Sequence, residues 1–417
     1  MLGLDKYQVR YHTFQDNLHQ SCRLSIRLYL GVRYFFNTVR GNVYERDLFR
    51  MSVCSYQSWF QNAVVFWLHM FRAECQQRIH KALEIDRDMV VVTSLVKYSN
   101  SSVDAQTTFS EIAQEWRHVD IEDADTAIMG VTKITDMICD GARAYASKIQ
   151  NILERNCYYD DNQDQFDVTD RMCITLNNIE HVRTFLKYLP QQLSWEEVAS
   201  KLSVKHEDAS TGDRSLATLK RLIQQAHQDI LQLSAKILKE VCAKMAVELQ
   251  ACMMGFLVKC PEKYSSSDRA IGYLSTNLET LRSRLSETIY PHIASELWAL
   301  VLDRFDTDMI AGKPPEYYDQ LQQHLRALTQ FFQSCWPHDA PYGVDTPFTL
   351  DIPAAGALRD KLDMCSQSST QLMLTYFQDL AAHMTTPVDY LGHLAVKVAY
   401  MEETRGNVTV YVKGRYM

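Results

Sequence analysis

Apolar residues recur every three or four positions along most of the chain, which is the spacing of amphipathic helices. The pattern is clearest over residues 216–256 and predicts one long helix there. The apolar positions of that helix are Leu219, Leu222, Ile223, Ala226, Ile230, Leu233, Ile237, Val241 and Met245. The same spacing predicts helices over residues 5–36, 54–86, 102–119, 123–155, 170–189, 194–206, 267–303, 315–334 and 354–383.

The end of the chain has a different pattern. Residues 394–400 and 407–413 alternate apolar and polar side chains around Arg405-Gly406, which predicts a β-hairpin. Two strands alone are marginally stable in water. We therefore expect the hairpin to be the start of a further β-domain, and the chain to be a fragment of a longer protein.

Turn-forming residues separate the predicted helices, as in residues 208–212, 312–315 and 337–343. The sequence has no short repeat of the tetratricopeptide or ankyrin type. These features predict an all-α fold, an elongated rod of stacked antiparallel helical bundles that ends in the truncated hairpin.

Composition narrows the class of protein. The net charge of -8 gives the chain no electrostatic footprint for nucleic acid. Its 11 cysteines form no C-x-x-C pair, and several occupy apolar helix positions, which is typical of a reducing compartment. The most apolar stretch, residues 63–68, is too short to span a bilayer. We expect a cytoplasmic protein whose membrane contacts are peripheral.

Asp160, Asp161 and Asp164 have the D-D-x-x-D spacing with which all-α prenyl-diphosphate enzymes hold magnesium. That chemistry requires a second acidic cluster facing the first, and the sequence has none. The segment also fails as a calcium loop, because Gln165 and Arg171 stand where Gly and Glu are required. We interpret it as a solvated acidic loop, keep the enzyme as an alternative, and predict no catalytic or metal-binding residue.

Large aromatic side chains at helical spacing are the candidate core anchors. Trp59, Trp67 and Trp116 lie among Leu, Ile and Phe residues, and Phe109 lies two turns before Trp116. The helix predicted over residues 102–119 would bury Phe109, Ile112, Trp116 and Val119. Its outward positions are then Thr107, Ser110, Glu111, Gln114, Arg117 and His118.

Three segments resemble the helical MUN domain of the uncoordinated-thirteen family of exocytic priming and tethering factors. The first begins at Trp59-Phe60 and continues through residues 81–86 and 96–104; the second covers residues 173–183 and 189–195. The third, residues 391–397, is similar to the entry to the C2 domain that follows the helical rod in this family. The resemblance is closest to the branch of the brain-specific angiogenesis-inhibitor-associated protein, followed by the haematopoietic paralogue.

The resemblance implies a division of the chain into segments. These are an N-terminal helical segment (residues 1–50), a first MUN homology segment (51–160), a middle bundle (161–264), a second homology segment (265–385) and the first two strands of a C2 domain (391–417). The calcium-binding loops of a C2 domain follow later strands. We therefore expect no cofactor in this fragment, while calcium could bind the rest of the C2 domain in the full-length protein.

The resemblance also implies a function. Family members bring membranes together and help syntaxin-class SNARE proteins assemble, so the chain is expected to be part of a non-enzymatic vesicle priming or tethering factor in regulated exocytosis or endosome–Golgi traffic. Phospholipid contact would occur through C2 domains, at the plasma membrane, secretory vesicles or late endosomes. A helical-rod subunit of a multisubunit tethering complex is the alternative.

SNARE binding would use the outward face of the helix over residues 102–119, which we take as the candidate partner-binding face. Neuronal family members have an Asn and a Phe three residues apart there, and Ser110 and Ala113 stand at those positions in this chain. The syntaxin-opening contact of the neuronal proteins is therefore not transferred. An ordinary solvated helix face is the alternative for these residues.

Overall fold

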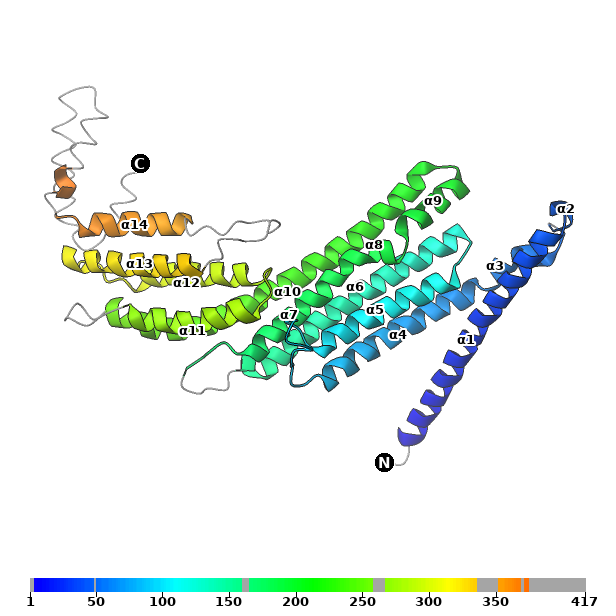
Figure 1. Ribbon diagram of the computed structural model, residues 1–417, viewed down its shortest axis with the longest axis horizontal. Coiled ribbons are helices and arrows are strands. Elements are labelled where there is room, and N and C mark those ends of the chain that lie inside the picture. The colour runs from blue at the N-terminus through cyan, green and yellow to red at the C-terminus, as the bar shows by residue number, and fades with distance from the viewer. Residues whose placement is uncertain are drawn as a thin grey trace, which may run out of the picture. The chain divides into compact units, whose positions relative to one another are not determined.

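The computed structural model describes residues 4–48, 50–159, 165–257, 267–335, 352–368 and 371–374. These residues form helices and their connections, with one isolated antiparallel bridge between Val91 and Ser99 and no other strand pairing (Figure 1). The predicted all-α fold is confirmed. The predicted hairpin within residues 391–417 and the acidic segment Asp160 to Asp164 lie outside the described residues.

The chain divides into two compact units. Unit 1 comprises Met1–Tyr159 and Arg171–Lys236, and unit 2 comprises Asp160–Asp170 and Ile237–Met417. Helix α10 (Ala209–Leu257) contributes to both. The single helix predicted over residues 216–256 is thereby confirmed, and its positions Leu219, Ala226, Ile237 and Met245 are buried.

Unit 1 is a bundle of helices. Its elements are α1 (Leu4–Asn42), α2 (Glu45–Leu48), α3 (Tyr56–Trp59), α4 (Gln61–Ile85), α5 (Asn100–Val119), α6 (Ala124–Arg155), α7 (Asp170–Phe185), α8 (Leu189–Gln192), α9 (Trp195–His206) and the first part of α10, with 3-10 turns at Ser52–Ser55, Cys157–Tyr159 and Leu186–Tyr188. Helices α4, α5 and α6 lie side by side (Figure 1). Their shared core contains Ile79 of α4, Phe109 of α5 and Ile138 of α6.

Unit 2 contains the rest of α10 together with α11 (Asp268–Arg284), α12 (Tyr290–Asp308), α13 (Pro315–Cys335) and α14 (Pro353–Ser366). Helix α14 packs on α12 and α13, and α11 packs on α13. The indole of Trp298 on α12 is buried against the ring of Phe332 on α13, with ring centroids 5.1 Å apart.

Three predicted helices are broken in the structure. The helix predicted over residues 354–383 ends at Ser366, where α14 stops and Gln367 takes an extended backbone. The helix predicted over residues 267–303 is two helices, because α11 ends at Arg284 and α12 begins at Tyr290. Pro291 in the first turn of α12 has no N–H to continue a preceding helix and restricts the residue before it. The helix predicted over residues 54–86 is interrupted at Phe60, whose N–H bonds only three residues back, to the carbonyl of Gln57.

The described part of the chain contains buried free cysteines and no helix that could span a membrane. Cys75, Cys139 and Cys242 are buried and free, and burial raises the pKa of each thiol to about 12, so they remain protonated. Within the same described residues, every helix is too short or too polar to cross a membrane.

Candidate partner-binding face

Helix α5 presents one apolar side to the core of unit 1. Phe109, Ile112, Trp116 and Val119 are all buried, as the helical spacing predicts, and Ala105 and Ala113 are buried with them. This side contacts α4, α6 and α8. Three neighbouring helices therefore hold α5 in place, and the side of α5 that faces away from them is the candidate partner-binding face.

The six predicted partner-binding residues all lie on that remaining side. Thr107, Gln114, Arg117 and His118 are exposed, whereas Ser110 and Glu111 are half-buried. The carboxylate of Glu111 forms an ion pair with Arg78 of α4 at 2.5 Å, which extends the polar surface from α5 onto α4. Ala113 is only 1% exposed, so its side chain has no access to a partner.

The predicted aromatic anchors are confirmed at three of four positions. Phe109, Trp67 and Trp116 are buried, and the two indoles stack with their ring centroids 6.2 Å apart. The prediction for Trp59 is wrong, because its side chain is 54% exposed. Tyr56, Phe60 and Val64, spaced four residues apart, occupy the buried positions of this segment, and Trp59 lies outside that stripe and faces outward.

A buried polar network fixes the segment of residues 86–99 that leads into α5. The Ser99 hydroxyl donates to the Asp86 carboxylate at 2.5 Å, and the same carboxylate accepts the backbone N–H of Ser101 at 2.8 Å. Asn178 of α7 accepts the N–H of Ser99 at 2.8 Å and donates to the Ser99 hydroxyl at 2.8 Å. We call Asp86, Ser99 and Asn178 the polar clamp.

Further contacts surround the polar clamp. Met89 is buried with a left-handed backbone (φ 48°), a conformation that costs about 1–2 kcal/mol outside glycine and persists where the surroundings fix it. Asn177 donates to the carbonyl of Lys97 at 2.7 Å. His181 stacks on Tyr98 with ring centroids 3.7 Å apart, and its Nδ1 lies 3.0 Å from the Ser102 hydroxyl.

This network was not predicted from the sequence, although the two segments that form it had both been noted. Residues 96–104 and 173–183 carried the family resemblance, and the structure brings them into contact through Ser99 and Asn178. One signal was available. Asn177 and Asn178 stand side by side within the apolar helix α7, and buried amides require hydrogen-bonding partners.

The chain matches a known protein family over most of its length. The model of the MUN domain matches residues 27–372, which include most of both units described above. The chain belongs to the MUN domain family. The polar clamp and the candidate partner-binding face are therefore features of a MUN domain.

Several MUN-domain relatives match most of the chain at low identity. Protein unc-13 homolog 4B of Drosophila melanogaster is 22% identical over 388 residues, covering 88% of this chain and 33% of the relative. Protein unc-13 homolog D of Rattus norvegicus is 23% identical, covering 90% and 33%. BAI1-associated protein 3 of Mus musculus is 21% identical, covering 82% and 28%. The chain thus spans about a third of the length of these relatives.

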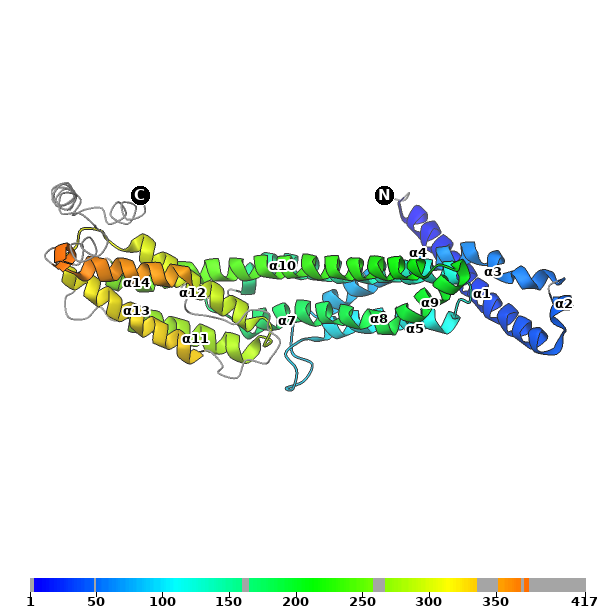
Figure 2. The same ribbon diagram turned by 90° about the horizontal axis from the view of Figure 1, so that it is seen from above.

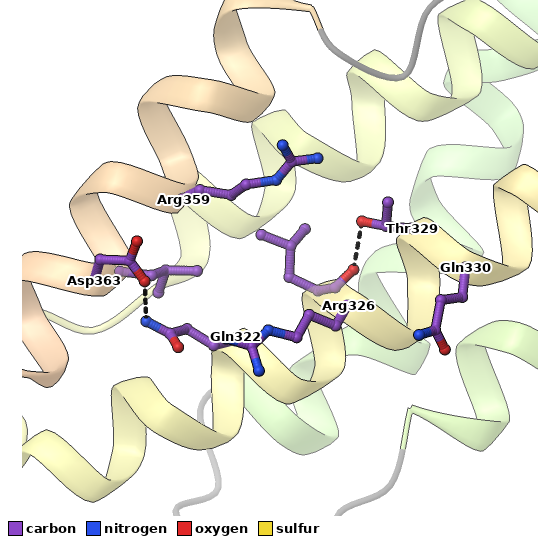
Figure 3. A pocket seen from close by; sticks show the side chains of 8 residues that line it. Gln322, Arg326, Thr329, Gln330, Arg359 and Asp363 are labelled. Carbon is purple, nitrogen blue, oxygen red and sulfur yellow. Dashed lines mark hydrogen bonds between the residues drawn. The ribbon is translucent and has the colours of Figure 1, made fainter.

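The MUN domain also has a pocket of about 310 Å³ between α13 and α14 in unit 2 (Figure 3). Gln322 donates to Asp363 across it at 2.6 Å, and the Thr329 hydroxyl donates to a carbonyl of its own helix at 2.7 Å. Arg326 and Arg359 supply its positive charges. None of its eight lining residues is a histidine or a cysteine, and only Asp363 is a carboxylate, so the lining lacks a pair of proton-transfer groups.

In the described ranges, no group of three or more His, Cys, Asp and Glu side chains is arranged to hold a metal ion. The acidic segment that suggested a magnesium site in the sequence is outside those ranges.

Proposed function

We propose that the chain is part of a non-enzymatic vesicle priming or tethering factor that promotes SNARE assembly in regulated exocytosis or endosome–Golgi traffic. The observation that supports this most is the MUN-domain match over residues 27–372, together with relatives named as unc-13 homologues. The protein would act in the cytoplasm and peripherally at the plasma membrane, secretory vesicles or late endosomes.

Within this proposal, syntaxin-class SNARE proteins bind the candidate partner-binding face of α5. A SNARE motif that binds as a helix requires a long rigid surface, and α5 is fixed on its other sides by α4, α6 and α8. The exposed charge of Arg117 and the Arg78–Glu111 pair give that surface a pattern that a complementary helix can recognise. Binding of this kind forms no covalent bond, and we propose that it requires neither metal nor nucleotide.

The test measures binding of the complete chain to the cytoplasmic region of a syntaxin, without lipid. Replacing Arg117 and His118 by Glu changes two exposed positions and should weaken binding by about fivefold or more, since rim charges act mainly through complementarity. Lys220→Glu on α10 is a matched control, because this lysine is exposed on another helix. Equal affinity of the double variant and the control would exclude this face.

A second pair of variants separates the Arg78–Glu111 ion pair from the rest of the face. Glu111→Arg alone places two like charges together, whereas Glu111→Arg combined with Arg78→Glu restores an ion pair in the opposite orientation. If syntaxin recognises the arrangement of charges on this face, both variants should bind weakly, although only the first variant loses the ion pair between positions 78 and 111. Recovery of full binding in the exchanged variant would mean that the pair acts only by stabilising unit 1.

A further inference from the structure

The connection between α4 and α5 has an aliphatic tip that is exposed to solvent. Val90, Val92 and Leu95 are 61%, 41% and 92% exposed. Figure 2 shows this connection, drawn in blue-cyan, projecting beyond the helices of unit 1 around it. Residues 89–96 contain no charged side chain, and charged residues bracket them: Arg87 and Asp88 on one side, and Lys97 on the other.

Three backbone donors of the tip form hydrogen bonds within the connection between α4 and α5. The N–H of Val92 donates to the carbonyl of Tyr98 at 3.1 Å, and the N–H of Val96 donates to the carbonyl of Thr93 at 3.3 Å. The N–H of Leu95 donates to the Thr93 hydroxyl at 3.3 Å. These three donors therefore lose no hydrogen bond to water when the tip leaves water.

The base of the connection is fixed by the polar clamp. Ser99 is bonded to both Asp86 and Asn178. The buried side chain of Met89 lies against Ser99 and Asn178, with its sulfur 3.6 Å from the Ser99 hydroxyl and 3.5 Å from the Asn178 amide. The exposed aliphatic side chains thus stand on a rigid support. Binding at the tip therefore costs little conformational entropy, because the loop is already ordered.

We propose that this tip is a membrane-contact site, which inserts Val90, Val92 and Leu95 into the interfacial region of a phospholipid bilayer. A bilayer fits the charge pattern, because a charged side chain is costly in hydrocarbon and the tip has none across eight residues. Arg87 and Lys97 lie at the edges of this run, where long basic side chains reach lipid headgroups.

An extended peptide added as a strand fits the tip less well than lipid does. Strand addition needs a row of unpaired backbone donors and acceptors, and the N–H groups of Val92, Leu95 and Val96 are already used inside the loop. Insertion is shallow, since the Thr93 and Ser94 hydroxyls favour the headgroup region, and the aliphatic side chains beside them reach only the upper part of the acyl chains. The proposed membrane contact is separate from the candidate partner-binding face of α5 and does not depend on SNARE binding.

The first experiment is flotation of the complete chain with neutral phosphatidylcholine vesicles at millimolar lipid. Wild type should float, and Leu95→Asp should lower its partition coefficient by about tenfold or more, because the variant loses apolar burial and adds a charge to the tip. Val204→Asp on α9 is the matched control, since Val204 is also an exposed aliphatic residue of unit 1, and should float like wild type. Failure of the wild type to float, or equal flotation of Leu95→Asp, would overturn the proposal.

The second experiment locates the residue in the bilayer. Leu95→Trp should be quenched by vesicles whose acyl chains carry bromine, whereas Val204→Trp should not, each compared with the wild-type tryptophan background. Quenching of neither variant, or of both to the same extent, would overturn insertion through this tip. Binding that appears only with phosphatidylserine and is insensitive to Leu95→Asp would assign membrane contact to basic side chains elsewhere and would likewise overturn it. A failure of the chain to bind syntaxin in the lipid-free test would contradict only the proposed function. It would not change the results expected from flotation and quenching.

Discussion

Asn178 contacts Ser99 through both ends of its side-chain amide. Its Oδ1 accepts the backbone N–H of Ser99 and its Nδ2 donates to the Ser99 hydroxyl, each at 2.8 Å. The two residues are 79 positions apart in the sequence. This pair of bonds joins the start of α5 to α7, and it fixes both the amide orientation of Asn178 and the base of the exposed loop.

Asn178→Ala should therefore destabilise unit 1. It leaves the buried N–H of Ser99 without a partner, and an unsatisfied buried donor together with a lost side-chain bond costs about 2–4 kcal/mol. The urea midpoint reports the change. Asn156→Ala is the control, because that exposed amide bonds only a carbonyl of the preceding helix. A midpoint for Asn178→Ala equal to that of the control would show that the polar clamp carries no stability.

The local pattern of the sequence predicted much of this fold. The spacing of Phe109, Ile112 and Trp116 identified the buried side of α5, and the spacing from Leu219 to Met245 identified α10. Both predictions depend only on neighbouring turns of one helix. The outward positions of α5 follow from the same period, so the exposed side of the candidate face was also predictable.

Long-range contacts were not predictable in this way. The bonds between Ser99 and Asn178 join residues from different helices, and no periodicity within either helix reveals them. Trp59 was misplaced because the buried stripe of its segment runs through Tyr56 and Phe60, and helical spacing alone did not decide which neighbouring aromatic residue faces the core. The break before Tyr290 was different: Pro291 marked it in the sequence.

The contrast between Trp116 and Trp59 gives a second prediction. Trp116→Ala should lower the free energy of unfolding by about 3–5 kcal/mol, since it removes a buried indole and leaves a cavity. Trp59→Ala should change it by less than about 0.5 kcal/mol, because that indole is mostly exposed. Denaturant titration of both variants checks this. A large loss in Trp59→Ala would mean that the outward indole is covered in solution.

Gly130 gives a third prediction, because it makes room for the same indole. A Cβ added at Gly130 on α6 would collide with the six-membered ring of Trp116 on α5. Gly130→Ala should therefore destabilise the protein by about 1–3 kcal/mol, although alanine is the better helix former. Gly31→Ala on α1 is the matched control: nothing lies within 4 Å of its added Cβ, so it should gain about 0.5–1 kcal/mol.

Melting temperatures of the two glycine variants should move in opposite directions. If Gly130→Ala raised the melting temperature as Gly31→Ala does, the indole of Trp116 would have to occupy a different position from the one in the structure.

The last prediction concerns pH and His181, which stacks on Tyr98 beside the polar clamp. Burial lowers the pKa of His181 below its ordinary value of 6.5. Burial, followed by the charge of Arg183, lowers the pKa of His227 in the same direction. Both imidazoles therefore take up a proton less readily in the folded protein than in the unfolded chain.

The sign of the effect follows from proton linkage. Because the unfolded chain binds more protons once the pH falls below about 6.5, the free energy of unfolding should be greatest above pH 7 and should decline from there toward pH 5. His181→Asn should make that decline shallower, since asparagine does not titrate, and adding His227→Asn should make it shallower again. Urea titrations at about pH 7.5, 6.5 and 5.5 measure how the free energy of unfolding changes with pH. A slope that is unchanged in His181→Asn would show that this imidazole is protonated equally in the folded and unfolded states, and that its contact with Tyr98 tolerates the charge.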